Sequence, residues 1–159
     1  MQVAQQGEAI LTLRAQEISA EEFSSLWLKA VIAEMYDTMQ ARQGVGIAAP
    51  QVYLSKRIII VASRANSRYP DAPNLPPVTM LNPVIIARSD DMLLGEEGCL
   101  SVPLQRGQVA RSASIQVRYA DIDGAIHTAE YQGFPARIVQ HEIDHLDGIL
   151  FTQRLTESI

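Results

Sequence analysis

The stretch His141-Glu142-Ile143-Asp144-His145 follows the pattern H-E-x-x-H within a segment that reads as a helix. Residues four apart lie on one face of a helix, so both imidazoles can reach one metal ion while Glu142 points beside it. Pro135 fits the first turn of this helix, and Gly148 lies just beyond its end. The pattern is only moderately specific, because two histidines on a helix can also be surface polar groups. It predicts a helix that carries two metal ligands and a base.

Segments with strand-like composition lie between this helix and an earlier, longer one. Ser19 with Glu22 forms the pattern of a capping box, and the apolar spacing after it predicts an amphipathic helix over residues 20–42. Trp27 and the methionines of that helix fall on its apolar face, so we expect them in the core. Expected strands cover 57–62, 79–87, 113–120 and 125–131, the last two joined by a turn at Asp123-Gly124. The sequence predicts an α+β fold of mostly antiparallel strands around a central metal-binding H-E-x-x-H helix, with a long N-terminal amphipathic helix.

Length and composition fit one domain over residues 1–159. Hydrophobic residues make up 47% of the chain and charged ones 19%, as in ordinary globular proteins, and no run approaches the roughly 20 apolar residues of a membrane helix. The first residues lack the regions of a secretion signal, so we expect a cytoplasmic protein. A net charge of −5 argues against a broad nucleic-acid surface, so neither DNA nor a membrane is expected as a partner. The Pro-rich residues 63–77 predict a surface loop.

A catalytic metal site needs a third protein ligand besides the two histidines. A metzincin would have a histidine where Phe151 stands, and the only downstream glutamate, Glu157, is two residues from the chain end. Cys99 is the one cysteine and lies between glycines and a proline, in a segment that reads as a loop. A thiolate with two imidazoles leaves the fourth tetrahedral position for water. His127 could complete a structural site, but it lies in an expected strand and reads as an ordinary half-exposed histidine. Cys99 is therefore the preferred ligand.

Three segments resemble the signature motifs of the peptide deformylases, in the same order: Gly44-Val45-Gly46-Ile47-Ala48-Ala49-Pro50-Gln51, Glu97-Gly98-Cys99-Leu100-Ser101 and Gln140-His141-Glu142-Ile143-Asp144-His145-Leu146. The similarity extends from the first helix to about Leu155. It implies an α+β metallohydrolase that removes the formyl group from the N-terminal formylmethionine of newly synthesised bacterial or organellar proteins. The family's motif cysteine and histidines hold the metal, which matches Cys99, His141 and His145. That metal is commonly Fe²⁺, and Zn²⁺, Ni²⁺ or Co²⁺ can occupy the same site.

Hydrolysis of a formamide needs an activated water, a place for the oxyanion and a proton for the departing amine. A bound divalent metal lowers the pKa of water from 15.7 toward about 7. Glu142 is then expected to accept the water proton and pass it to the amine nitrogen. The resemblance nominates the side-chain amide of Gln51 and the backbone N–H of Leu100 as donors to the oxyanion.

Substrate binding is expected to involve the glycines of the first two motifs. Gly44 and Gly46 either supply a turn with positive φ or take part in binding, and both roles can hold together. A peptide can add as an extra strand along an exposed backbone edge, and the missing side chains at Gly46 and Gly98 allow its close approach. The resemblance implies the same mode, with the formylmethionyl nascent peptide as partner.

The methionine side chain of such a peptide needs an apolar slot, and three candidates for its walls are Val45, Phe134 and Ile138. Plain core packing is an equally good interpretation of these residues. Metal-bound histidines usually donate their second N–H to a polar partner, and the candidates for holding the site in place are Gln140, Asp144 and Arg111. Arg106 and Arg111 also resemble family positions, although solvated surface arginines are their default interpretation.

The chain differs from many bacterial members of the family in two places. Those members continue into a C-terminal helix that can dock on the ribosome, whereas this chain ends at Ile159, so transient ribosome contact stays open as a partner interaction and docking by that route is in doubt. The 63–77 loop is longer than the connection in compact members. Two other functions stay open: a metal-dependent amidase or peptidase acting on other substrates, and a catalytically silent binding module.

Overall fold

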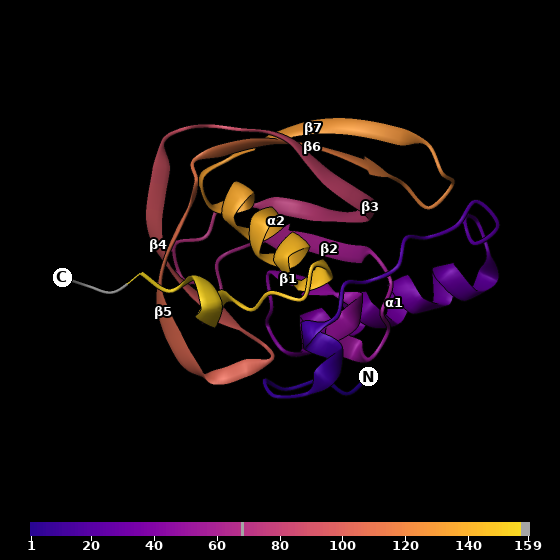
Figure 1. Cartoon of the computed structure of the whole chain (residues 1–159), viewed down its shortest axis with the longest axis horizontal. Helices are drawn as coiled ribbons and strands as arrows, with labels where there is room; N and C mark the ends of the chain where they lie inside the picture. Colours follow the sequence, from indigo (N-terminus) through magenta and orange to yellow (C-terminus); the bar gives the residue numbers. More distant parts are fainter. Residues whose placement is uncertain (68, 157–159) are drawn as a thin grey trace.

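The computed structural model describes residues 1–67 and 69–156 of the chain. Within these residues the helices are α1 (Leu26–Ala41) and α2 (Gly133–Leu146), and short 3₁₀ turns cover Ala9–Thr12, Ala49–Val52 and Phe151–Arg154. The strands of the same part are β1 (Gly46–Ala48), β2 (Ile58–Ser63), β3 (Leu75–Arg88), β4 (Met92–Cys99), β5 (Val102–Ser112), β6 (Ser114–Ala120) and β7 (Ile126–Gln132). Helix α2 lies at the centre of the molecule, with the β4–β5 hairpin on one side and α1 on the other (Figure 1).

The strands form two antiparallel sheets. Five of them pair in the order β1-β2-β3-β6-β7, and β4 pairs with β5 in a separate two-stranded sheet. Every residue of β2 is buried, because alternate side chains face opposite layers. Ile59 and Val61 pack with α2, whereas Ile58 and Ile60 pack with α1. The α+β class with antiparallel strands is confirmed, and α2 rests directly on the sheet.

Helix α1 is shorter than predicted and begins at Leu26 instead of residue 20. The residues before it form a turn in which the N–H of Ser19 donates to Oε1 of Glu22, as in a capping box, while the N–H of Glu22 bonds the carbonyl of Ser19 and not its hydroxyl. Ser24 has a φ of 61°, which interrupts any helix, and Ser25 then caps α1 by accepting a hydrogen bond from the N–H of Leu28. The prediction of a 20–42 helix was therefore wrong in its first turns.

Burial within α1 also differs from the prediction at one residue. Met35 and Met39 are fully buried, as expected from their spacing, but Trp27 is 42% exposed. Trp27 lies in the first turn of the true helix and is not among its buried residues, which include Leu28, Met35 and Met39. Its assignment to the core was wrong. No helix in the described part of the chain combines the length and apolar character needed to cross a membrane.

Four predicted strands are confirmed, with ends shifted by up to four residues, as β2, β3, β6 and β7. The β4–β5 hairpin was not predicted; residues 95–103 read as a loop, yet most of them are paired strand. The Pro-rich loop is also shorter than 63–77, because β2 includes Ser63 and β3 starts at Leu75, with its prolines at the beginning of the strand. Glu157 and the last residues of the chain lie outside the described residues.

Pro135 and Gly148 bracket α2 as predicted. Pro135 falls in the first turn of the helix, where a missing N–H costs nothing. Gly148 has a φ of +77°, and a Cβ there would lie 2.5 Å from the backbone oxygen of Thr12. This position therefore requires glycine twice over, for its conformation and for the close approach of the N-terminal segment.

Candidate metal centre and active site

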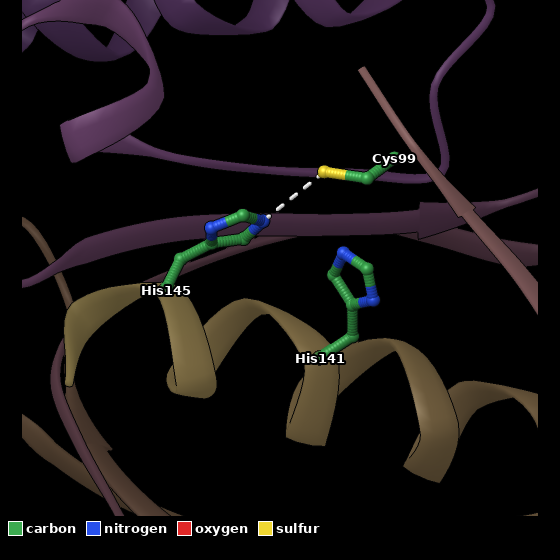
Figure 2. Close-up of side chains that lie close together, drawn as sticks. All are labelled: Cys99, His141 and His145. Carbon is green, nitrogen blue, oxygen red and sulfur yellow. Dashed lines mark hydrogen bonds between the residues drawn. The ribbon is translucent and has the colours of Figure 1, made fainter. Parts of the chain in front are cut away.

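Three side chains that can ligate a metal converge from two elements. His141 and His145 project from α2, one helical turn apart, and Cys99 reaches them from the end of β4 (Figure 2). Their ligand atoms all lie within 4.8 Å of one another, and all three residues are buried. The Sγ of Cys99 is 3.3 Å from Nε2 of His145. The structure thus brings together the three residues that the sequence singled out, although the strand carrying Cys99 was not expected.

The other ring nitrogen of His141 is held by Glu97. Its Nδ1 lies 2.9 Å from Oε1 of Glu97, which leaves Nε2 of the imidazole for the cluster. Arg111 grips the same carboxylate with two bonds of 2.9 Å, and Arg137 adds one of 2.7 Å. Glu97 belongs to the second motif, but the sequence analysis predicted no function for its side chain. Because it lies two residues before Cys99 on a strand, both side chains point to the same face, and recognising β4 would have found it.

Electrostatics favour an ionised Glu97 and a thiolate at Cys99. Burial alone would raise the pKa of both groups. For Glu97, the hydrogen bonds from Arg111 and His141 outweigh burial and hold the pKa of the carboxyl well below its usual range. For Cys99, the charges and hydrogen bonds of His145 and His141 lower the pKa of the thiol well below its ordinary value. A low-pKa thiol beside two imidazoles is the form that binds a divalent metal.

Glu142 lies in the same pocket against the backbone of β1. A Cβ on Gly46 would come within 2.5 Å of its Oε2, so only glycine leaves room for the carboxylate. Burial raises the pKa of Glu142, and its Oε1 has no hydrogen-bond partner within the described part of the chain. An unpaired carboxylate oxygen beside three ligands is placed to exchange a proton with a reacting group.

Gln51 and Leu100 both line this pocket. The Oε1 of Gln51 accepts a hydrogen bond of 3.0 Å from the N–H of Ala48, which fixes the side-chain amide. Its Nε2 then points toward the ligands, 3.1 Å from Oγ of Ser101 and 3.5 Å from Sγ of Cys99. The amide is therefore held with its donor end directed at the metal centre.

The apolar wall of the pocket contains all three residues proposed for the methionine slot, Val45, Phe134 and Ile138. Gly46 and Gly98 also line it, but Gly44 faces elsewhere: a Cβ added to Gly44 would lie 3.2 Å from the side chain of Leu100 and 3.4 Å from that of Met39. Neither Gly44 nor Gly46 has a positive φ; the left-handed residue is Gln43, with a φ of 55°. The turn interpretation of the two glycines was therefore wrong.

Comparison with known proteins decides the family. The family model described as polypeptide deformylase matches residues 1–158. This chain belongs to the peptide deformylase family. Peptide deformylase 2 of Nostoc sp. is 44% identical over 148 residues, covering 93% of this chain and 83% of that protein. Peptide deformylase 2 of Shewanella oneidensis is 46% identical over 152 residues, covering 96% and 82%.

A solved deformylase structure is also similar. The class I type b peptide deformylase from Acinetobacter baumannii with Met-Ala-Ser bound has a TM-score of 0.96 and 57% identity, with 98% of each chain covered. The family consists of hydrolases that remove the N-formyl group from nascent peptides, and its members are metalloenzymes. The Cys99, His141 and His145 cluster is the potential metal site of this deformylase.

The polar residues expected around the deformylase site have definite partners. Arg111 is buried between Glu97 and Asp144, so its default interpretation as a surface arginine was wrong. Gln140 bonds the backbone N–H and carbonyl of Ser112. The partly exposed Arg106 pairs with a surface carboxylate of β4 and lies over an aromatic ring, in agreement with a position near solvent.

His127 lies on β7 with a largely exposed side chain and pairs with Asp121 at 2.7 Å, away from the metal cluster. This position agrees with the prediction that His127 is not part of the metal site. Two other pocket residues were missed by the sequence analysis. Arg137 lies one turn before His141 on the same helix face. The four-residue spacing could have predicted that both side chains face the site. Tyr69 reaches the pocket from the loop after β2, and no sequence pattern pointed to it.

Proposed function

We propose that this chain removes the N-formyl group from the formylmethionine at the start of newly synthesised proteins and releases formate. One observation supports this most directly: Cys99 and His141, which form a buried cluster with His145, line a pocket together with Glu142 in a chain of the deformylase family. The proposal treats residues 1–159 as one domain acting in the cytoplasm, where a reducing environment keeps a ligand cysteine free.

The donor set fits a divalent transition metal. Cys99 offers a low-pKa thiol, and His141 offers Nε2 because Glu97 occupies its Nδ1. We propose Fe²⁺ as the physiological ion, with Zn²⁺, Ni²⁺ or Co²⁺ able to replace it. When bound, such an ion supplies Lewis-acid activation of water near neutral pH. Protein purified without oxygen should contain about one ion per chain; activity that is stable in air would point away from iron.

Glu142 is the proposed base. Its carboxylate faces the pocket with one oxygen unpartnered in the described residues, and burial raises the pKa of the group toward the range of an acid/base catalyst. It takes a proton from the attacking water and delivers that proton to the amine nitrogen as the C–N bond of the formamide breaks. This transfer yields formic acid and a free N-terminal amine; the acid then releases its remaining proton, which the amine takes up, leaving formate and an ammonium group.

Gln51 and Leu100 are the proposed donors to the formyl oxygen as it becomes negative. The hydrogen bond from Ala48 fixes the amide of Gln51, so little reorganisation is needed when charge develops. Leu100 follows Cys99 directly in the chain and lines the same pocket as Gln51. Each such donor typically contributes a factor of about 10²–10³ to kcat.

A peptide is the proposed substrate, as the Acinetobacter baumannii deformylase with Met-Ala-Ser bound supports. Val45, Phe134 and Ile138 would enclose its methionine side chain. Its backbone would pair along β4 at Gly98, whose N–H donates a hydrogen bond of 3.3 Å to the hydroxyl of Tyr69 and would exchange that partner for a peptide carbonyl. Close approach of the peptide at Gly46 was expected, but the side chain of Glu142 fills the space beside that glycine.

The decisive experiment is formate release from a formyl-Met peptide by metal-loaded protein under anaerobic conditions. Glu142→Ala should reduce kcat by about 10²–10⁴-fold while the metal content stays at the wild-type value. Glu130→Ala, which removes an exposed carboxylate on β7, serves as the matched control and should keep full activity. Undiminished formate release by Glu142→Ala would disprove the assignment of the base. Faster cleavage of acetylated or unblocked peptides than of formylated ones would favour another amidase or peptidase.

A further inference from the structure

Arg137 binds the β4–β5 hairpin at three points. It lies on α2 one turn before His141, and its side chain is buried. Nη1 donates to Oε2 of Glu97 at 2.7 Å and to the carbonyl of Val109 at 2.8 Å, and Nη2 donates to the carbonyl of Leu93 at 2.7 Å. One guanidinium therefore links α2 to both strands of the hairpin and to the carboxylate that orients His141.

Gly95 makes this arrangement possible. It lies on β4 directly opposite Val109, and a Cβ added there would be 2.8 Å from both Cζ and Nε of Arg137. The guanidinium thus lies flat against the strand backbone at residue 95. Its three hydrogen bonds prevent it from moving aside without losing a partner, so any side chain at this position must displace it.

The two metal ligand elements are joined through this contact. Cys99 comes from β4 and the histidines come from α2, so the distance between hairpin and helix sets the distance between thiolate and imidazoles. Arg111 extends from β5 and also holds Glu97, and its Nη1 donates to Asp144 of α2, so it forms a second link between hairpin and helix. Arg137 differs from Arg111 because it comes from the histidine helix itself and binds the backbone of both hairpin strands as well as Glu97.

We propose that Arg137, seated on Gly95, is a positioning residue for the metal: it fixes Glu97 and the β4 strand relative to α2, and so sets the geometry of His141 and Cys99. The proposal rests on the metal site of the proposed function. It extends that site to a residue that touches neither the metal nor, in this role, the substrate.

The test measures affinity for Co²⁺ alone, by competition with a chelator, together with the visible spectrum of the Co²⁺ protein. Arg137→Met should weaken Co²⁺ binding by about 10- to 100-fold, the usual range for a residue that supports a metal ligand, and should alter the spectrum. Arg57→Met is the matched control. Arg57 is also buried, and it bonds the carbonyl of Leu146 and the carboxylate of Asp147 at the C-terminal end of α2, just after the ligand His145. That control should lower stability but leave Co²⁺ affinity and spectrum unchanged.

Two further variants keep the test valid if Arg137→Met does not fold. Gly95→Ala retains every charge and should still weaken Co²⁺ binding by up to about 10-fold. Arg137→Lys keeps the charge without the planar fork, so it should lose less affinity than methionine. In the Arg137→Lys background, Gly95→Ala should cost little more, because lysine places no guanidinium under residue 95.

The possible outcomes separate this proposal from the metal site itself. Wild-type protein that binds no stoichiometric Co²⁺ would overturn both. Wild-type binding with unchanged affinity in Gly95→Ala and in Arg137→Met or Arg137→Lys would overturn only the role of Arg137. An equal loss of affinity in Arg57→Met would also overturn it, because the effect would then follow general stability.

Discussion

The two faces of α2 are both buried, yet they are built in opposite ways. The face against the five-stranded sheet is apolar and packs into one core cluster: Ala136, Val139, Ile143 and Leu146. The face toward the β4–β5 hairpin is polar and consists of Arg137, Gln140, His141 and Asp144. Both sets recur at three- and four-residue spacing, so one helix presents two complementary stripes.

The difference lies in what each face requires from its neighbours. An apolar face needs matching volume, which several side chains can supply. A buried polar face needs a specific partner for each group, and here the partners come from the hairpin: Leu93, Glu97, Val109, Arg111 and Ser112. Burying such groups adds little net stability. Their arrangement instead fixes the site, so changes on the two faces should have separable effects on stability and on metal binding.

The largest effect is expected for Arg111→Met on the polar side. This change leaves the buried Glu97 without its two-bond partner and removes one cation from Asp144. Loss of one partner from a buried ion pair costs about 3–5 kcal/mol, and because Glu97 keeps its bond to Arg137 the free energy of unfolding should fall by at most that amount. Denaturant unfolding of metal-free protein measures it, because bound metal would add its own stabilisation. Affinity for Co²⁺ should fall as well, since Glu97 orients His141.

The control for this variant is Arg14→Met. Arg14 pairs with Asp147 at 3.8 Å on the surface, where its side chain is 74% exposed. An exposed pair of this kind contributes about 0–1 kcal/mol. If both arginine variants lowered stability equally, burial of the Glu97 pair would not be the cause.

Leu146→Ala tests the apolar side. Leu146 is fully buried in the cluster between α2 and the sheet, and truncation leaves a cavity there. We expect the free energy of unfolding to fall by about 2–5 kcal/mol with Co²⁺ affinity unchanged once the protein is folded. Leu104→Ala, at a leucine 99% exposed, should leave both quantities unchanged. A loss of metal affinity in Leu146→Ala would show that the two faces are not separable.

Gly46→Ala tests the pocket edge between the two faces. The new methyl group would meet Oε2 of Glu142 at 2.5 Å and force the carboxylate to move. A displacement of about 1 Å at a reacting group can cost about 100-fold, so kcat/KM for a formyl-Met peptide should fall by that factor. Metal content should stay at one ion per chain because no ligand is touched. Gly44→Ala should lose less activity, because its methyl group would meet the side chains of Leu100 and Met39 at 3.2 and 3.4 Å and the backbone oxygen of Gly46 at 3.5 Å.

Much of this arrangement was contained in local spacing. The H-E-x-x-H segment, Pro135 and Gly148 predicted α2 correctly, because helix periodicity and end signals act over a few residues. The apolar, β-branched run before Ser63 likewise predicted β2. Elimination among the possible third metal ligands predicts Cys99, and the structure places Cys99 beside both histidines.

The missing parts depended on long-range pairing. Residues 95–103 contain glycines and a proline, so they read as a loop, but strand pairing with β5 outweighs that local preference. Because β4 is not predicted from the sequence, the sequence does not show that Glu97 and Cys99 share one face of a strand. The contact of Glu97 with His141 is therefore not predicted either. The predicted start of α1 was wrong because a local signal was followed too far. Ser19 and Glu22 do form a hydrogen-bonded turn, but the left-handed Ser24 ends that turn before a helix can form.

The smallest effect is expected at the solvent edge of the polar face, for Arg154→Met. Arg154 bonds Asp144 at 2.6 and 3.1 Å, yet its side chain is 44% exposed. Asp144 also keeps its bond to Arg111, so no carboxylate is left unpaired. Unfolding of metal-free protein should show a loss of about 0.2–1 kcal/mol, and Co²⁺ affinity should not change. A loss of stability as large as that of Arg111→Met would mean that the polar network from Glu97 to the surface acts as one unit. The two faces of α2 would then differ in chemistry, but a single substitution on either face would affect the stability of the whole face.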